Sequence, residues 1–423
     1  MLTLAYLLSF LDRQILSLMV GPIRRDLSLT DTEFSLLHGF AFALFYTFLG
    51  IPIARLADNW NRRRLIAIGI AVWSLATAMA GLARNFVQLF AARISVGVGE
   101  AALSPAAYSM LADRFPREHL GRAIGIYSSG VFIGIGLSFI IGGLLVSSLE
   151  AAGGLYVPGL GTLASWQATF MIVGLPGLLV ALLMLTLREP ERVASGHAFD
   201  QRTDPSAILA WIRRHGRMYL THFLGFGLLA LLFNAIMAWA PEFFIRIHGQ
   251  ERAWAGTRLG LIAAVFGGSG IICGGLFTDW LSRRGELAAP MQAGLIGIAL
   301  LTPFAIAAPL VADTRLALAL FCPVLFFSSF PFGPAASALQ MVTPLRMRAQ
   351  VSAVYLFVVN LLGIGFGGTA TALVTDYVFR DGMRLHHAMS SIAAVAGLTA
   401  IVMLWLSLRP FRRGHGEILG HPG

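Results

Sequence analysis

Two charged residues, Arg93 and Glu100, lie inside an apolar stretch from Val87 to Ala112 that is long enough to cross a lipid bilayer. A charged side chain at bilayer depth costs at least about 2.5 kcal/mol, so such residues usually face a water-filled or protein-lined interior. About two helical turns separate the pair, so both side chains lie on one face of the predicted helix. The pair predicts a polar interior site that binds an anion or exchanges protons. The structural alternative is an ion pair that only holds two helices together.

A second pair of charges, Asp12 and Arg13, falls near the middle of the first apolar stretch, Leu2–Val20. Adjacent helix positions differ by about 100°, so one side chain can face the interior while the other contacts a neighbouring helix. Mutual neutralisation at a ragged helix end is the structural alternative, but the stretch continues well past both residues. Protonation of a carboxylate would release its arginine partner, freeing a guanidinium for an anionic group on a substrate.

Other polar side chains in apolar stretches carry weaker signals. His38 could relay protons, but a lone interior histidine more often has only a structural role. Five further residues are predicted to line a cavity: Tyr46, Asn234, Gln340, Tyr355 and Asn360. The spans of the second half hold almost no ionisable residue, and phenylalanines crowd the tenth span. A polar first half and an aromatic second half suit an amphiphilic substrate.

The composition identifies the elements that must position these side chains. The chain has 423 residues, of which 57% are hydrophobic and 12% charged, whereas a soluble protein is normally about 25% charged. Its apolar runs are long and continuous rather than alternating, which favours membrane-spanning helices over a β-barrel. No removable signal peptide is expected, because Met1 opens almost directly into the first span. The predicted fold class is an all-α polytopic membrane protein.

The charge pattern and the motifs argue against several function classes. All 31 basic residues are arginines, and most lie in short loops rather than in a stripe with aromatic residues, so no nucleic-acid partner is expected. Without lysine the chain has no Gly-x-x-x-x-Gly-Lys loop, and it has neither an HExxH nor a Gly-x-Ser-x-Gly motif. Cys273 and Cys322 both fall within spans, which argues against a disulfide framework. We expect no enzymatic activity, no metal and no cofactor, with a membrane-embedded enzyme as a remote alternative.

Twelve spans are predicted, in two sets of six separated by a polar linker. The first set is Leu2–Val20, Phe34–Leu56, Leu65–Ala83, Val87–Ala112, Ala123–Leu149 and Ala164–Leu187. The second set is Met218–Ile245, Leu259–Leu281, Ala289–Leu310, Leu316–Val342, Val351–Tyr377 and Ala388–Leu408. The predicted domains are an N-terminal bundle (1–187), a cytoplasmic linker (188–217) with a short surface helix at Pro205–Arg214, a C-terminal bundle (218–408) and a cytoplasmic tail (409–423).

The loop arginines predict the orientation. The loops on the side of the linker hold 19 arginines and the opposite loops hold 9. Because arginine-rich loops stay in the cytoplasm, the linker and both termini are expected there, in the inner (cell) membrane.

The two halves also repeat in order. Ala54-Arg55-Leu56-Ala57-Asp58 matches Gly275-Leu276-Phe277-Thr278-Asp279, and each is followed by an arginine pair. Ser104-Pro105-Ala106-Ala107 matches Gly333-Pro334-Ala335-Ala336, and Gly121-Arg122-Ala123 matches Met347-Arg348-Ala349. The offsets of 221, 226 and 229 residues drift slowly, which indicates duplicated six-helix units.

These motifs resemble those of the major facilitator superfamily. Asp58 followed by Arg62 and Arg63 resembles its loop after the second span, although Ala54 and Asn61 replace two usual glycines; Arg93-x-x-x-Gly97-x-Gly99 resembles its fourth-span motif. Within the superfamily, Phe10-Leu11-Asp12-Arg13 and Gly97-Val98-Gly99-Glu100-Ala101 resemble the Spinster family of lipid transporters. The resemblance implies two pseudo-symmetric six-helix bundles around a central cavity, with Asp12 and Glu100 as the proton-coupling pair and Arg13 and Arg93 binding a substrate phosphate or carboxylate.

The loop charges predict a cytoplasmic gate. Asp58 is expected to bond the start of the eleventh span near Arg348, because helix N-termini favour anions. Arg62 is expected to pair with Asp113, and Asp279 with Arg122 in the pseudo-symmetric position. Ordinary loop charge is the alternative reading, and for Arg63 and Arg64 it is the better one.

The predicted function is proton-coupled transport of a lysolipid, a sphingoid or another amphiphilic small molecule by alternating access, in a monomer. The alternative of the same fold is a proton symporter for a small organic anion of the sugar-acid type, whose carboxylate Arg93 would bind.

Overall fold

A computed structural model describes residues 1–191, 205–344 and 347–419 of the chain. Its contacts divide the chain into two compact units. The first comprises Met1–Val193, Ile236–Ala264 and Ile364–Ala388; the second comprises Ala194–Ala235, Val265–Gly363 and Met389–Gly423. The first unit therefore contains the predicted N-terminal bundle together with two segments that follow the predicted linker. The division into two six-helix domains stays a prediction.

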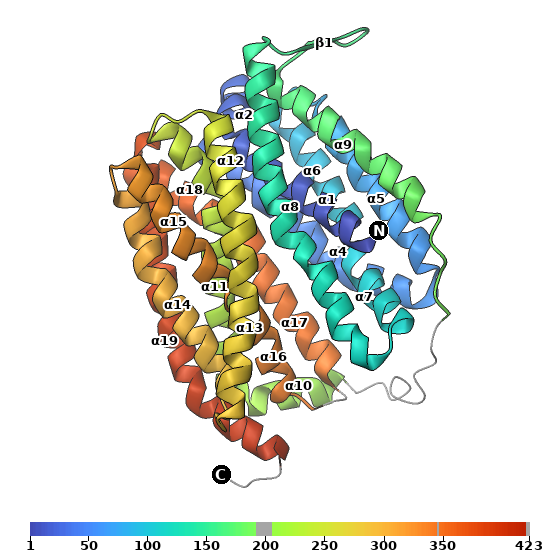
Figure 1. The fold of residues 1–423 in the computed structure, drawn as a ribbon, viewed down its shortest axis with the longest axis vertical. Helices are drawn as coiled ribbons and strands as arrows, with labels where there is room; N and C mark the ends of the chain where they lie inside the picture. The colour runs from blue at the N-terminus through green and yellow to red at the C-terminus, as the bar shows by residue number, and fades with distance from the viewer. Residues whose placement is uncertain (192–204, 345–346, 420–423) are drawn as a thin grey trace. The chain divides into compact units, whose positions relative to one another are not determined.

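The described part of the first unit is helical apart from one hairpin (Figure 1). Its elements up to the linker are α1 Leu2–Gln14, η1 Ile15–Leu18, α2 Val20–Leu27, α3 Asp31–Ser35, η2 Leu36–Phe40, α4 Ala41–Asn59, α5 Arg62–Ala80, α6 Phe86–Glu100, α7 Leu103–Arg114, α8 Arg117–Ala151, β1 Leu155–Val157, β2 Gly161–Leu163 and α9 Ser165–Met184. After the linker this unit adds the end of α11, α12 Arg252–Ile262, α18 Gly367–Leu373, η7 Val374–Phe379 and η8 Gly382–Arg384.

The elements of the second unit are also helices. They are α10 Pro205–Arg214, α11 Gly216–Arg246, η3 Ala263–Gly267, α13 Gly268–Arg283, α14 Ala289–Ala307, η4 Ala308–Leu310, α15 Thr314–Ser329, α16 Phe332–Met341, α17 Arg348–Asn360, η6 Leu361–Gly365 and α19 Leu385–Leu419, where α11, η3, η6 and α19 begin or end in the first unit. The surface helix predicted within the linker is confirmed as α10. Trp211 of α10 donates a hydrogen bond to the Tyr219 hydroxyl over 3.0 Å, which attaches this helix to the start of α11.

The predicted number of spans is confirmed. In the described ranges, eleven helices are long and apolar enough to cross a membrane, and a twelfth span results if the bent pair Leu2–Leu18 and Val20–Leu27 counts as one. This pair bends by 61°, and the second span begins at Asp31 rather than at Phe34. The start at Asp31 follows from a capping box, in which the Thr30 hydroxyl accepts from the Glu33 backbone and the Glu33 carboxylate accepts from Thr30.

Glycines allow two helices from opposite halves of the sequence to pack closely in the first unit. A Cβ atom on Gly136 of α8 would lie 2.8 Å from the backbone oxygen of Gly260 of α12, and one on Gly143 would lie 3.1 Å from the Cα of Gly256. Contacts this short leave no room for a side chain at any of the four positions. We call these four residues the glycine seam.

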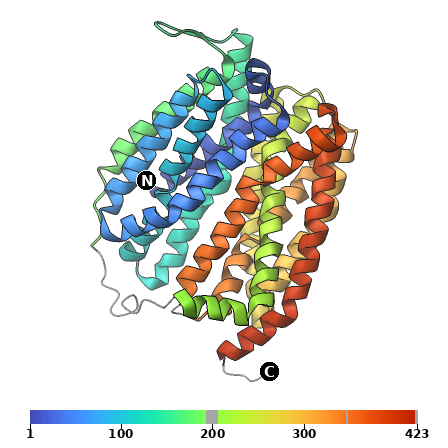
Figure 2. The same cartoon turned by 180° about the vertical axis from the view of Figure 1, so that it is seen from behind.

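The helices before the linker form the rest of the unit's core. α5 packs between α6 and α9, and α1 packs along α8 (Figures 1 and 2). Trp73, Ile70 and Val96 are fully buried between them. Gly69 and Gly99 face each other where α5 meets α6, so α6 lies deep in the unit and carries its charged residues inward.

Candidate functional site

The two pairs of intramembrane charges lie in the same unit. Arg13 of α1 and Glu100 of α6 form a hydrogen-bonded ion pair, and both are buried. The guanidinium carbon of Arg13 lies 4.2 Å from the ring centre of Phe42 and 4.7 Å from that of Phe10, which adds cation–π attraction. The structure therefore ties the first span to the fourth by a charge pair lined with aromatic rings.

Arg93 is the least satisfied of these residues. Its side chain is fully buried (0% exposed), and its Nε donates a hydrogen bond to the backbone oxygen of Leu37 over 3.3 Å. Both terminal nitrogens, Nη1 and Nη2, lack a partner within the described part of the chain. A buried guanidinium with unused donors is costly unless a ligand or a second conformation supplies acceptors. Arg93 is therefore the strongest candidate for holding an anion.

Asp12 and Glu100 both retain acceptor capacity. Asp12 is 3% exposed and accepts one hydrogen bond, from the Thr77 hydroxyl over 3.3 Å. Asp12 lies close enough to Glu100 and Arg93 to interact with their charges. The Oε1 atom of Glu100 has no partner among the described residues. We call Asp12, Arg13, Arg93 and Glu100 the charge cluster; with Thr77 it forms one buried polar site in the first unit.

The other predicted cavity residues divide between the two units. Tyr46 lies 5.4 Å from Arg13, measured from its ring centre to the guanidinium carbon. Asn234, Tyr355 and Asn360 belong to the second unit. Asn234 donates to the Ala230 oxygen of its own helix, Tyr355 is buried, and Asn360 is half-buried. Their roles in substrate binding stay predictions, as does that of Gln340.

His38 lies close to the charge cluster without joining it. It is 9% exposed on the π-helical turn η2, and its Nε2 has no partner within the described ranges. A proton-relay role for His38 therefore gains no direct support from the hydrogen bonds.

A second charged group surrounds Arg62, at the end of the unit that carries residues 59–64 and 187–190. The predicted contact with Asp113 is confirmed as a hydrogen-bonded ion pair. Arg62 also pairs with Glu189 over 2.9 Å and donates to the Pro190 oxygen over 3.0 Å. Glu189 and Pro190 open the linker and the other residues precede it, so this group joins α5, α7 and the segment after α9. We call this end, predicted to be cytoplasmic, the inner end.

The remaining gate predictions are not tested. Arg122 and Asp279 are exposed and belong to different units, and Arg348 donates to the Thr343 oxygen in its own unit. Asp58 lies in the last turn of α4, and its side chain lies outside the described residues. The gate role of these four residues stays a prediction.

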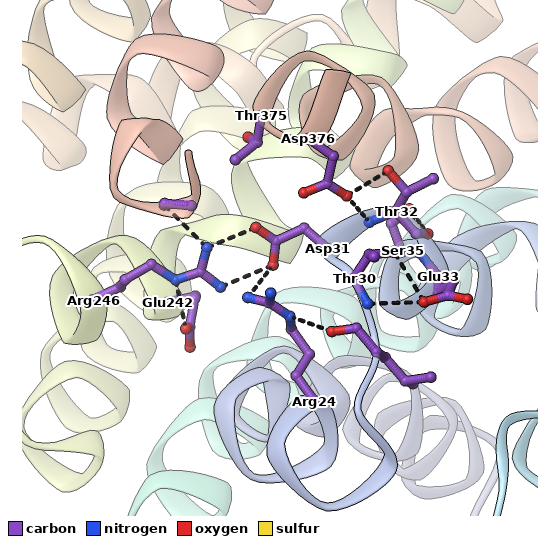
Figure 3. Close-up of polar contacts among 12 residues, drawn as sticks. Arg24, Thr30, Asp31, Thr32, Glu33, Ser35, Glu242, Arg246, Thr375 and Asp376 are labelled. Atoms are coloured by element: carbon purple, nitrogen blue, oxygen red, sulfur yellow. Dashed lines mark hydrogen bonds and ion pairs between the residues drawn. The ribbon is translucent and has the colours of Figure 1, made fainter. Parts of the chain in front are cut away.

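The first unit has a further ionic network at the end where α2 lies, opposite the inner end (Figure 1); we call this the outer end. Figure 3 shows the contacts of this network. Asp31 is fully buried and accepts from both terminal nitrogens of Arg246, over 2.7 and 2.9 Å. Arg24 pairs with the same carboxylate over 2.6 Å, and Glu242 pairs with Arg246 over 3.0 Å. A bidentate pair of this kind fixes geometry as well as charge.

A neighbouring contact supports the same junction. The backbone nitrogen and the hydroxyl of Thr32 each donate to Asp376 of η7 over 2.7 Å. The residues from before the linker are Arg24, Asp31 and Thr32, and those from after it are Glu242, Arg246 and Asp376. We call these six residues the outer clamp.

Sequence reasoning missed the outer clamp. Arg24 and Arg246 are two of the nine arginines in the loops opposite the linker, which predict only the orientation, and the acidic residues of these loops match no motif. The one available signal was the capping box at Thr30 and Glu33, which fixes the start of α3 and thereby the direction of Asp31.

Glu189 makes the inner-end group sensitive to acid. Burial by itself raises the pKa of Glu189, but the hydrogen bonds from the Arg62 side chain and the Arg63 backbone outweigh it, so the pKa lies below the ordinary value of 4.5. Its contribution to stability is therefore fully present above pH 4.5 and is lost as the pH falls through the lowered value.

Glu189→Gln is expected to lower the thermal midpoint at pH 7 and to flatten its decline between pH 5 and pH 3. The loss at pH 7 should be about 1–2 kcal/mol, because a charge-assisted hydrogen bond is removed. Thermal unfolding of the detergent-solubilised protein across this range measures it. Glu191→Gln, at an exposed position in the same segment, is the control and should follow the parent curve. Identical pH curves for both variants would refute the assignment.

The chain resembles known proteins in sequence and in structure. A family model described as Major Facilitator Superfamily matches residues 2–368. The crystal structure of a bacterial homolog to the human lysosomal transporter Spinster, in an inward-facing and unoccupied conformation, is similar with a TM-score of 0.78 and 27% identity, covering 99% of this chain and 96% of that chain.

Similar sequences include proteins of two kinds. A probable L-galactonate transporter of Escherichia coli is 26% identical over 96% of this chain and 88% of its own length. Protein spinster homolog 1 of Bos taurus is 28% identical over 69% of this chain and 56% of its own length.

Proposed function

This chain belongs to the Major Facilitator Superfamily and is a multi-pass membrane transporter of Spinster type; from that premise we propose that it moves an anionic amphiphile, such as a lysolipid, coupled to protons. The single observation that carries the proposal is the charge cluster. A buried ion pair, a second buried carboxylate and an arginine with two unused nitrogens stand together in one unit. The family is one of transporters rather than enzymes.

The proposed cycle follows from what each residue can exchange. Glu100 holds Arg13 while it is ionised, and protonation removes the charge that holds the pair together. Arg13 is then free to bind a phosphate or carboxylate, and Arg93 offers its two unused nitrogens. Asp12 carries a second proton-accepting carboxylate, positioned by Thr77. Substrate binding and proton binding are therefore linked through the same two arginines, Arg13 and Arg93.

The outer clamp supplies the conformational element. It joins residues from before and after the linker, as expected for a contact that closes one side of an alternating-access transporter. In the proposed orientation, with the linker and both termini in the cytoplasm, this is the side away from the cytoplasm. The Arg62 group joins α5, α7 and the first residues of the linker, all within the first unit, so it braces the inner end of that unit instead.

A second candidate substrate class has a specific observation in its favour. The galactonate transporter relative aligns over 96% of the chain at 26% identity, close to the 27% identity of the Spinster homolog. A sugar acid would place its carboxylate on Arg93 in the same way. The aromatic rings of Phe10 and Phe42 around Arg13 favour the amphiphile.

Uptake into proteoliposomes with an imposed pH gradient tests the proposal. We expect a labelled lysophospholipid to accumulate in response to the gradient and L-galactonate not to. Arg93→Gln should reduce lysophospholipid uptake at least tenfold, whereas Arg64→Gln, an exposed arginine of the α5 start, should not change it. Gradient-driven uptake of galactonate alone would establish the second candidate. Uptake that ignores the gradient would refute proton coupling.

A further inference from the structure

The first unit contains a cavity at its inner end that is separate from the charge cluster. Its volume is about 630 Å³, and it is formed by the start of α1, the end of α7, the start of α8 and residues 187–190. We call it the inner cavity. It is large enough for a phospholipid headgroup and the first part of an acyl chain.

One wall of the inner cavity is basic. Arg114, His119, Arg122 and Arg188 line it, and no acidic side chain does so among the residues that the structure describes. None of the three arginines forms an ion pair within the described ranges. Three guanidinium groups around one space repel one another unless an anion occupies it.

The acidic residues adjacent to Arg114 and Arg188 are engaged elsewhere. Asp113 precedes Arg114 and Glu189 follows Arg188, and both carboxylates are held by Arg62. Because Arg62 binds both of these acids, neither carboxylate is available to pair with an arginine of the cavity. The sequence alone hides this effect, since Asp113-Arg114 and Arg188-Glu189 read as self-neutralising pairs.

The opposite wall is apolar and leads to an exposed apolar surface. Met110, Leu111 and Tyr127 line the cavity and are buried, whereas Ile126 lines it and is 57% exposed. Ile133 lies two turns further along the same face of α8 and is 44% exposed. An acyl chain leaving the cavity past Ile126 would therefore continue along a surface already suited to hydrocarbon.

We propose that the inner cavity binds the phosphate group of an anionic phospholipid from the surrounding leaflet. Arg114, Arg122 and Arg188 hold the phosphate, and the acyl chain lies against Ile126. Basic pockets beside apolar helix surfaces at a membrane interface suit this ligand class. The site is distinct from the charge cluster and does not depend on which substrate the protein transports.

Binding to the purified full-length chain tests the site. Native mass spectrometry of delipidated protein, titrated with phosphatidylglycerol or phosphatidylcholine, should show at least tenfold tighter retention of phosphatidylglycerol. The triple variant Arg114→Gln/Arg122→Gln/Arg188→Gln should lose that preference. The control Arg55→Gln/Arg64→Gln/Arg413→Gln removes the same charge from exposed positions outside the cavity and should keep it. Equal loss in both variants would refute a specific site.

Two further measurements distinguish a lipid phosphate from a soluble phosphate and control for misfolding. Inorganic phosphate and glycerol 3-phosphate should not displace the lipid at millimolar concentration; displacement would assign the cavity to a soluble anion and overturn the proposal. Ile126→Trp narrows the cavity without changing its charge. It should weaken phosphatidylglycerol retention at an unchanged thermal midpoint, and full retention would contradict the proposed path of the acyl chain.

Discussion

Asp31→Asn is expected to shift the protein strongly towards a state in which its outer end is open. Asp31 is the shared acceptor of Arg24 and Arg246, and the substitution leaves both guanidinium groups without that charge. Removing one partner of a buried, hydrogen-bonded charge pair costs about 2–5 kcal/mol. If the interaction exists only in the closed state, its loss raises the ratio of open to closed molecules by at least about thirtyfold.

Distances between nitroxide labels at Arg25 and Arg384 measure this shift. Both positions are exposed, and they lie on the two sides of the outer clamp in the sequence. The parent protein should give one short distance, and Asp31→Asn should add a longer one. Glu33→Gln is the matched control, because its carboxylate bonds only to Thr30 in its own helical turn. An unchanged distance distribution in Asp31→Asn would show that the outer clamp does not hold the closed state.

Glu100→Gln is expected to abolish transport driven by a pH gradient, with uptake falling at least a hundredfold. The amide still accepts a hydrogen bond from Arg13, but it cannot exchange a proton or neutralise the buried guanidinium. Proton-coupled transport therefore loses the group that binds and releases the proton. Counterflow, in which labelled substrate exchanges for unlabelled substrate without net proton movement, should persist at a measurable rate.

The comparison of the two assays distinguishes coupling from folding. Asp12→Asn should show the same pattern, because Asp12 is the second carboxylate of the charge cluster. Thr77→Val removes only the hydroxyl that donates to Asp12 and should reduce uptake severalfold while keeping its pH dependence. If both carboxylate variants kept the parent's pH dependence, the proton-coupling assignment would be wrong.

The sequence was sufficient for the fold because the bilayer limits the solutions. Long apolar runs must be helices when their backbone groups have no water to bind, so the spans could be predicted. Their ends were predicted less well: the helix predicted as Leu259–Leu281 begins at Arg252, and the one predicted as Ala388–Leu408 ends at Glu417. The helix Pro205–Arg214 was predictable from its position in a polar linker. The 61° bend after Leu18 also has a local signal, because Pro22 has no N–H to donate to the Leu18 carbonyl and follows Gly21.

The candidate site was predictable only in part. Charges inside spans are rare enough to be noticed singly, which identified Asp12, Arg13, Arg93 and Glu100. Their pairing was left open: the sequence did not decide whether Arg13 or Arg93 holds Glu100, and the structure pairs Arg13 with it.

Loop charges are common, so no pattern in the sequence singles out Asp31. Its importance comes from burial and from Arg246, a residue 215 positions away in the sequence. Contacts of that length arise from tertiary packing, which local pattern does not encode.

The glycine seam also determines what kind of motion α8 and α12 can make. Side chains that interdigitate fix the register of the two helices they join. At Gly136, Gly143, Gly256 and Gly260 there is no side chain to interdigitate, and the two backbones are in direct contact. Without interdigitating side chains, α8 and α12 can slide along each other as readily as they can separate. Their relative motion therefore needs no single pivot, and the polar contacts at their ends limit its extent.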